Sequence, residues 1–192
     1  KFIFPKKCPS CGSKTIKEFN NITKKEDAVR RCSSEGYECE KIAIEKLKHF
    51  VSKDAFNIEG LGKKIVENFW NLNLIKLPQD IFKLDFKKIE NLEGWGIQSM
   101  ENLKYSINQR KNISLERLIY SLGIRHIGLE NAKILSKYFR SFSNFINFSK
   151  EVNLDDILNI DGIGETQLKS VKNFFNNKVN LNILKELQKI LF

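Results

Sequence analysis

The segment Ile58-Glu59-Gly60-Leu61-Gly62 sets a pattern that recurs along this chain of 192 residues. The pattern is apolar, any residue, Gly, apolar, Gly. Two more segments match it fully and a third has His for the first Gly: Leu92-Glu93-Gly94-Trp95-Gly96, Ile160-Asp161-Gly162-Ile163-Gly164 and Ile124-Arg125-His126-Ile127-Gly128. The third positions are residues 60, 94, 126 and 162, so the intervals are 34, 32 and 36 residues. Such a period indicates one supersecondary unit copied along the chain.

Each copy lies between stretches whose apolar residues recur at helical spacing, for example Leu115, Leu118, Ile119 and Leu122. Because Gly adopts positive φ, each copy can close a tight turn between two helices. The second helices are expected to begin near Lys63, Ile97, Leu129 and Glu165. No long alternating stretch predicts a sheet, so the fold class is mainly α, with four helix-hairpin-helix units.

A phosphate group is the ligand that such a turn favours. The first N–H groups of a helix have no partner within it, and they lie at the positive end of the helix dipole. A single turn of this kind is more often a plain helix cap. Four of them on a basic chain favour a DNA-binding repeat. A dinucleotide-binding loop is excluded, since no strand precedes the turns and no third Gly follows.

The candidate DNA-binding residues are the hairpin glycines and the side chains beside them: Gly60, Gly62, Lys63, Lys64, Gly94, Gly96, Arg125, His126, Gly128, Gly162 and Gly164. The first hairpin favours a phosphate, because two lysines follow it. The fourth is the least favourable, because four acidic residues flank it: Asp155, Asp156, Asp161 and Glu165. His126 is either a phosphate donor or a packed polar residue.

Four cysteines occupy the first 39 residues: Cys8, Cys11, Cys32 and Cys39. The Cys8-Pro9-Ser10-Cys11 knuckle is typical of a structural zinc site, in which four thiolates leave no open position for water. The second pair is weaker evidence because six residues separate Cys32 from Cys39. His49 is an alternative fourth ligand, but its position on an amphipathic helix favours a surface or packing role. Four free thiols of a decayed site are the alternative to a metal site.

Composition and charge limit the kinds of partner that this chain can bind. There are 33 Lys and Arg against 23 Asp and Glu, a net charge of +10. This excess suggests a polyanionic partner, although a basic surface kept for solubility is the alternative. No apolar run reaches the length of a membrane span, so no membrane partner is expected.

We expect a zinc finger over residues 1–42 and a helical domain over 43–192. The start at Lys1 suggests a piece of a longer polypeptide.

Several stretches resemble bacterial NAD-dependent DNA ligases. The zinc finger of that family is similar to residues 4–13, Phe-Pro-Lys-Lys-Cys-Pro-Ser-Cys-Gly-Ser. Its hairpins are similar to residues 49–52 with 58–62, and to Leu122-Gly123-Ile124-Arg125-His126-Ile127-Gly128, where a His is usual. The resemblance covers essentially the whole chain and identifies a C-terminal fragment with the zinc finger and the helix-hairpin-helix domain.

The resemblance implies a modular enzyme whose domains clamp duplex DNA. In that family a lysine takes AMP from NAD and the enzyme seals a nick using magnesium, in DNA replication and repair. This chain lacks the nucleophile motif Lys-x-Asp-Gly, so alone it is expected to be inactive. Zinc is the cofactor expected here, and NAD and magnesium belong to the missing catalytic part. The partners implied are double-stranded, nicked DNA and the remaining domains of the same polypeptide, in the bacterial cytoplasm at the nucleoid. The alternatives are a stand-alone helix-hairpin-helix adaptor of recombination or excision repair and an inert helical scaffold.

Overall fold

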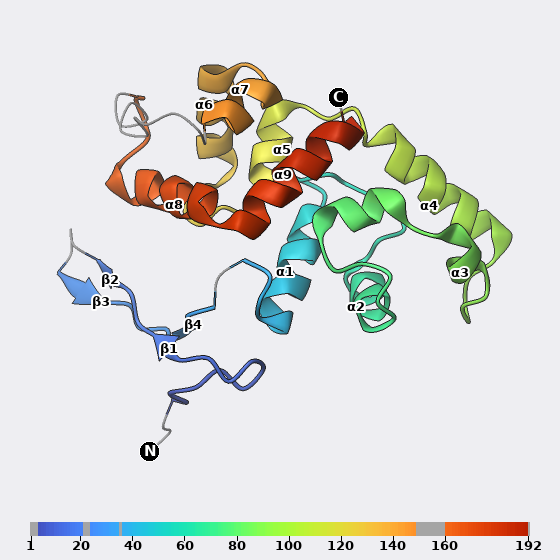
Figure 1. Cartoon of the computed structure of the whole chain (residues 1–192), viewed down its shortest axis with the longest axis horizontal. Helices are drawn as coiled ribbons and strands as arrows, with labels where there is room; N and C mark the ends of the chain where they lie inside the picture. The colour runs from blue at the N-terminus through green and yellow to red at the C-terminus, as the bar shows by residue number, and fades with distance from the viewer. Residues whose placement is uncertain (1–3, 21–23, 35, 149–159, 192) are drawn as a thin grey trace. The chain divides into compact units, whose positions relative to one another are not determined.

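A computed structural model describes residues 4–20, 24–34, 36–148 and 160–191 (Figure 1). The chain divides into two compact units, Lys1–Ala43 and Ile44–Phe192. Within the described ranges, no helix has both the length and the apolar character needed to cross a membrane.

The first unit is built from four short strands. β1 (Thr15–Ile16) pairs antiparallel with β4 (Arg31–Cys32), and β2 (Phe19–Asn20) pairs antiparallel with β3 (Lys25–Glu26). Of its described residues, Thr15, Cys39 and Ala43 alone are buried. So small a core cannot stabilise a fold by apolar burial, and a unit of this size needs a cross-link.

The second unit is helical throughout its described part. The helix bounds are α1 Glu40–Phe50, α2 Lys63–Asn71, the 3₁₀ helix η1 Pro78–Lys83, α3 Phe86–Glu90, α4 Ile97–Gln109, α5 Leu115–Ser121, α6 Leu129–Phe139, α7 Phe142–Phe148, α8 Glu165–Asn176 and α9 Lys178–Leu191. The prediction of a mainly α chain is confirmed. So are the four expected starting residues of the second helices, which open α2, α4, α6 and α8. α1 begins at Glu40, three residues before the expected start of the helical domain.

Aromatic side chains form the core of this unit. Phe50 and Phe56 are fully buried and stack with ring centroids 4.3 Å apart, and the Phe82 ring stands at their edges. A second cluster joins Phe139, Phe145 and Phe175 from three helices. The last helix, α9, contacts η1, α7 and α8, so the end of the chain closes over elements far apart in sequence.

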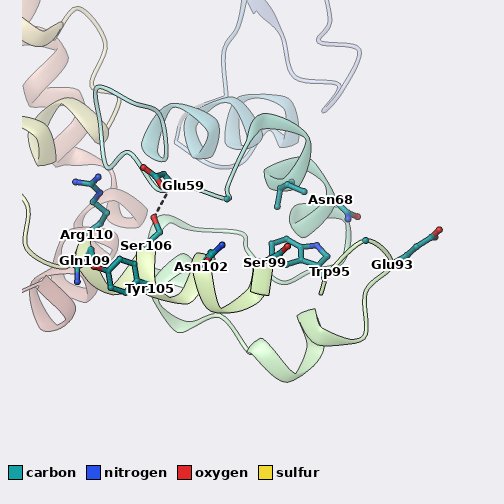
Figure 2. A pocket seen from close by; sticks show the side chains of 13 residues that line it. Glu59, Asn68, Glu93, Trp95, Ser99, Asn102, Tyr105, Ser106, Gln109 and Arg110 are labelled. Carbon is teal, nitrogen blue, oxygen red and sulfur yellow. Dashed lines mark hydrogen bonds between the residues drawn. The ribbon is translucent and has the colours of Figure 1, made fainter. Parts of the chain in front are cut away.

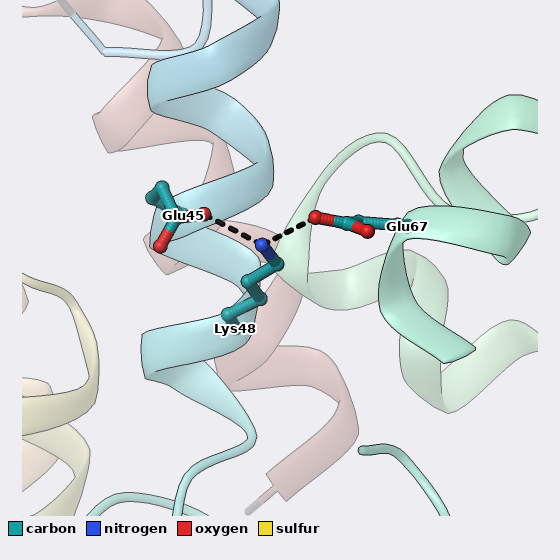
Figure 3. Close-up of polar contacts among 3 residues, drawn as sticks. All are labelled: Glu45, Lys48 and Glu67. Carbon is teal, nitrogen blue, oxygen red and sulfur yellow. Dashed lines mark hydrogen bonds and ion pairs between the residues drawn. The ribbon is translucent and has the colours of Figure 1, made fainter. Parts of the chain in front are cut away.

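An ion-pair bridge ties α1 to α2, the helices on either side of the first hairpin (Figure 3). Lys48 Nζ lies 2.6 Å from Glu45 Oε1 and 2.6 Å from Glu67 Oε1. The hydrogen bond from Lys48 to Glu45, and then the one to Glu67, raise the pKa of Lys48. The Lys48 side chain is 11% exposed, so solvent screens these contacts less than it screens a fully exposed pair.

We expect Phe50→Ala to lower the free energy of unfolding of the helical unit by about 3–5 kcal/mol, because it leaves a cavity in the aromatic core. Leu72→Ala is the matched control, since Leu72 is 44% exposed and its truncation should change stability by less than about 0.5 kcal/mol. Urea denaturation followed by circular dichroism measures both. Equal unfolding midpoints for the two variants would contradict this account of the core.

Candidate metal centre and nucleic-acid interface

The four cysteine thiols converge on one point in the first unit. The Sγ atoms of Cys8, Cys11, Cys32 and Cys39 all lie within 4.8 Å of one another. Cys8 Sγ is 4.0 Å from Cys39 Sγ, and Cys11 Sγ is 3.4 Å from Cys32 Sγ. Tetrahedral zinc with Zn–S bonds of about 2.3 Å requires sulfurs about 3.8 Å apart, so the cluster fits a metal ion. Cys39, the weakest candidate in the sequence, is buried within this cluster.

Hydroxyl groups next to the cluster favour the thiolate form. The Ser13 hydroxyl, and then that of Ser34, lower the pKa of Cys11 to about 5. The backbone N–H of Ser34 also donates to Cys32 Sγ, at 3.4 Å. Thiolates rather than thiols bind metals, so the hydroxyl donors prepare Cys11 as a ligand. His49 is not in the cluster; its Nε2 donates to the Tyr120 carbonyl, at 2.7 Å, and so joins α1 to α5.

One backbone hydrogen bond closes each of the four hairpin turns. The N–H of the fourth pattern residue donates to the carbonyl of the first, from Leu61, Trp95, Ile127 and Ile163 at 3.3, 3.1, 3.1 and 3.0 Å. The third residue has positive φ every time, at +90° for Gly60, +81° for Gly94, +87° for Gly162 and +59° for His126. A turn with positive φ at its third residue favours Gly there, and His126 holds the same region at a cost. The turns are therefore four copies of one structure.

The second Gly of each turn is the N-cap of the helix that follows, and no side chain caps any of the four. The first helical hydrogen bond runs from Val66, Met100, Ala132 or Leu168 N–H to the carbonyl of Gly62, Gly96, Gly128 or Gly164. The N–H groups of the first three helical residues therefore lack a partner within their helix. All four cap glycines are exposed. Each turn thus presents an uncapped helix N-terminus to the surface.

The charges beside the turns differ. Lys63 and Lys64 are exposed at the first turn. At the third, Arg125 Nε donates to His126 Nε2 at 3.1 Å, and both side chains are exposed. The structure therefore favours neither interpretation of His126. Its side chain is exposed, which argues against a packed polar residue, and its Nε2 already accepts a hydrogen bond, which argues against a free phosphate donor. Exposed Asp161 and Glu165 flank the fourth turn, whereas Asp155 and Asp156 lie outside the described residues.

An open groove of about 820 Å³ lies between the first two hairpins, along one face of α4 (Figure 2). It brings together Glu59 and Glu93, Trp95 and Tyr105, and Arg110 at one end. Sequence reasoning missed this groove, since the residues that line it come from turns 34 positions apart and the repeat pattern carries no signal for their contact. Trp95 lies 5.4 Å from Phe69 between ring centroids, so it anchors the second turn.

Comparisons with known proteins bear on both units. A sequence model described as the helix-hairpin-helix motif matches residues 117–184, which include the third and fourth turns. The chain is 68% identical over 191 residues to a protein named DNA ligase from Pelagibacter ubique (strain HTCC1062), covering 100% of the chain and 28% of that protein. It is 40% identical to the DNA ligase of Parvibaculum lavamentivorans and 44% identical to that of Wolbachia pipientis wMel, covering 98% and 97% of the chain and 28% of each. The chain spans little more than a quarter of these relatives, and the resemblance to DNA ligases is confirmed.

Removing the metal should unfold the first unit and spare the helical unit, because the cysteine cluster replaces a core there. Small zinc modules derive around 10–16 kcal/mol of folding free energy from the ion. We expect about one zinc ion per chain in the parent and in His49→Gln, and loss of the ion in Cys39→Ser. Elemental analysis gives the stoichiometry, and amide hydrogen exchange with and without chelator shows which unit opens. Well under one ion in fresh, reduced parent protein would refute the site.

Proposed function

Since the chain is similar over its whole length to a segment of bacterial DNA ligases, we propose that it is the non-catalytic part of an NAD-dependent DNA ligase that grips duplex DNA. It binds the phosphate backbone through its hairpin turns, without reading base sequence. The duplex that it holds carries the nick to be sealed, in replication and repair.

The cap glycines are the observation that carries this proposal. Among the described residues, and apart from the glycine itself and its two chain neighbours, no heavy atom lies within 4 Å of where a Cβ would stand at Gly62, Gly96 or Gly128. Their φ values of −65°, −96° and −83° suit any residue. Neither backbone strain nor internal packing therefore requires Gly at these positions. An external group that approaches the uncapped N–H groups closely does require it, and phosphate is the anion that helix N-termini bind.

The charges beside the four turns indicate how much each contributes to phosphate binding. Lys63 and Lys64 stand at the first, and Arg125 and His126 at the third, where cations attract phosphate. At the fourth, Asp161 and Glu165 oppose it, and Gln167 Oε1 lies 3.3 Å from where a Cβ would stand at Gly164. We propose that the first and third turns contribute most to affinity, and the fourth least.

The cysteine module has a structural role in this proposal. Four thiolates complete the coordination of zinc, leaving no position for a reacting water. The module fixes the fold of residues 4–43, while NAD and magnesium act in the catalytic part of the parent enzyme. There a lysine carries AMP to the 5′-phosphate at the nick. The proposed location is the bacterial cytoplasm, at the nucleoid.

A stand-alone DNA-binding adaptor remains a weaker candidate. The matches to DNA ligases extend over 97–100% of the chain, and so include the cysteine module as well as the hairpins. An adaptor that used the hairpins alone would not account for that extent.

Gly62→Val and Gly128→Val should each weaken binding to a nicked duplex by roughly tenfold or more, because a side chain keeps phosphate from charge-assisted hydrogen bonds. Fluorescence anisotropy measures affinity, and thermal melts should show a folded protein, since the added Cβ meets no described atom. Lys63→Ala with Lys64→Ala should flatten the slope of log K against log salt by up to about 2. Gly164→Val is the matched control at the fourth turn and should bind like the parent. If the Gly62 and Gly128 variants fold and bind as tightly as the parent, the hairpins are scaffold.

The chain alone should take no AMP from NAD, because it lacks the Lys-x-Asp-Gly motif. Incubation with NAD and magnesium, followed by intact mass spectrometry, should leave its mass unchanged, with a full-length bacterial DNA ligase as the positive control. A stable AMP adduct on any lysine of this chain would overturn the division of labour proposed here.

A further inference from the structure

The loop that leads into the first hairpin is held by two arginines from distant helices. Arg117, in α5, donates from Nε to the Ala55 carbonyl at 2.8 Å and from Nη2 to the Lys53 carbonyl at 2.6 Å. Arg110, the C-cap of α4, donates from Nε to the Asn57 carbonyl at 3.1 Å. Three alternate carbonyls of residues 53–57 thus accept hydrogen bonds from guanidinium groups.

The turn itself rests on the same helix, α4. The Glu59 N–H donates to Ser106 Oγ at 2.8 Å, the contact drawn in Figure 2. A Cβ at Gly60 would stand 3.4 Å from Leu103 Cδ1, so the turn lies directly against α4. Ser106 and Leu103 are buried. From residue 53 to residue 60, the approach to the first hairpin is therefore fixed by one face of α4 and the start of α5.

The loop needs this support because its own backbone is strained. Asn57 has φ of +51°, a region that residues other than Gly adopt at a cost. Its internal hydrogen bonds include Ala55 N–H and Asn57 N–H to the Ser52 carbonyl, at 3.0 and 2.8 Å. The loop ends one residue before the turn whose cap, Gly62, leads into α2. The path of the loop therefore sets where the first hairpin presents its amides.

The chemistry of the guanidinium group suits this positioning task. Its N–H donors lie in a rigid planar fork, and for Arg117 two of them reach carbonyls two residues apart. A lysine ammonium is a point charge on a flexible stem and cannot reproduce the fork. In sequence, Arg110 and Arg117 belong to the basic excess that suggests phosphate contacts. In the structure, Nε of both arginines and Nη2 of Arg117 donate to the protein's own backbone.

We propose that Arg110 and Arg117 are positioning residues that hold the first hairpin in its phosphate-binding geometry, an inference that rests on the proposed function. They act through the loop of residues 53–57 and touch no phosphate. The first hairpin is thereby kept in place by the second helix of the second hairpin and the first helix of the third.

Salt-titrated binding of the whole chain to a nicked duplex separates positioning from direct contact. Arg117→Met and Arg117→Lys should both weaken binding by roughly threefold to thirtyfold, which lies within the range for residues coupled through one network. The slope of log K against log salt should stay that of the parent. A phosphate contact would instead lose about 0.9 of slope in the Met variant and recover it in the Lys variant. Arg140→Lys, at an exposed arginine of the same unit, is the matched control and should be silent.

A double-mutant cycle tests the route through the first hairpin. In a Gly62→Val background, Arg117→Met should have no further effect on binding, whereas in a Gly128→Val background it should keep its full effect. Thermal melts accompany each variant. If Arg117→Met does not fold, Arg117→Lys and Arg110→Lys, which should behave alike, carry the same cycle.

The outcomes distinguish the two proposals. If Gly62→Val and Gly128→Val both leave binding unchanged, the proposed function fails. If Gly62→Val alone leaves binding unchanged, the first hairpin does not contact phosphate and positioning is wrong. If Gly62→Val weakens binding but the folded Arg117 and Arg110 variants bind like the parent, positioning is wrong. A lowered slope in Arg117→Met, or effects that add fully to those of Gly62→Val, would also overturn positioning.

Discussion

Each hairpin depends on a single backbone hydrogen bond, from the N–H of the fourth residue of the turn to the carbonyl of the first. That bond forms only if the third residue takes positive φ, which Gly does freely. Its consequence is the sharp reversal that leaves the next residue buried and the one after it exposed as a helix cap. Leu61, Ile127 and Ile163 are buried in this way, while the cap glycines face solvent. The exposed helix N-termini that the proposed function uses therefore result from the way in which the turn closes.

The two glycine positions of a turn favour Gly for different physical reasons. The first needs positive φ, which Gly adopts freely and His126 adopts at a cost. It also faces a neighbouring helix in two turns: Gly60 lies against Leu103 of α4, and a Cβ at Gly162 would stand 2.8 Å from Ile134 Cδ1 of α6. The first turn therefore packs on the second helix of the second hairpin, and the fourth turn packs on the second helix of the third. The second glycine meets no such demand at Gly62, Gly96 or Gly128. This division separates the residues that pair the hairpins from those that a ligand would constrain.

The two units are stabilised by different physics. The helical unit buries two aromatic clusters, one around Phe50 and Phe56 and one around Phe145 and Phe175. The first unit has almost no buried side chains among its described residues, and its order depends on four thiols with hydroxyl donors around them. Burial of apolar area stabilises the helical unit, whereas the first unit has in its place a cysteine cluster that could hold a metal ion. Removal of a metal ion from that cluster would therefore affect the first unit and not the second.

The sequence alone determined the features whose causes are local. Five residues are enough to impose the turn, because positive φ and the apolar anchor lie within it, and so the starts of α2, α4, α6 and α8 could be predicted to the residue. The Cys8–Cys11 knuckle is local in the same sense. Tertiary structure decided the rest. It brought Cys39 to a cluster 31 residues from Cys8, and it directed Arg110 and Arg117 to carbonyls 53, 62 and 64 positions away. Net charge counts every cation alike, but only packing decides whether a guanidinium faces a phosphate or the protein's own backbone.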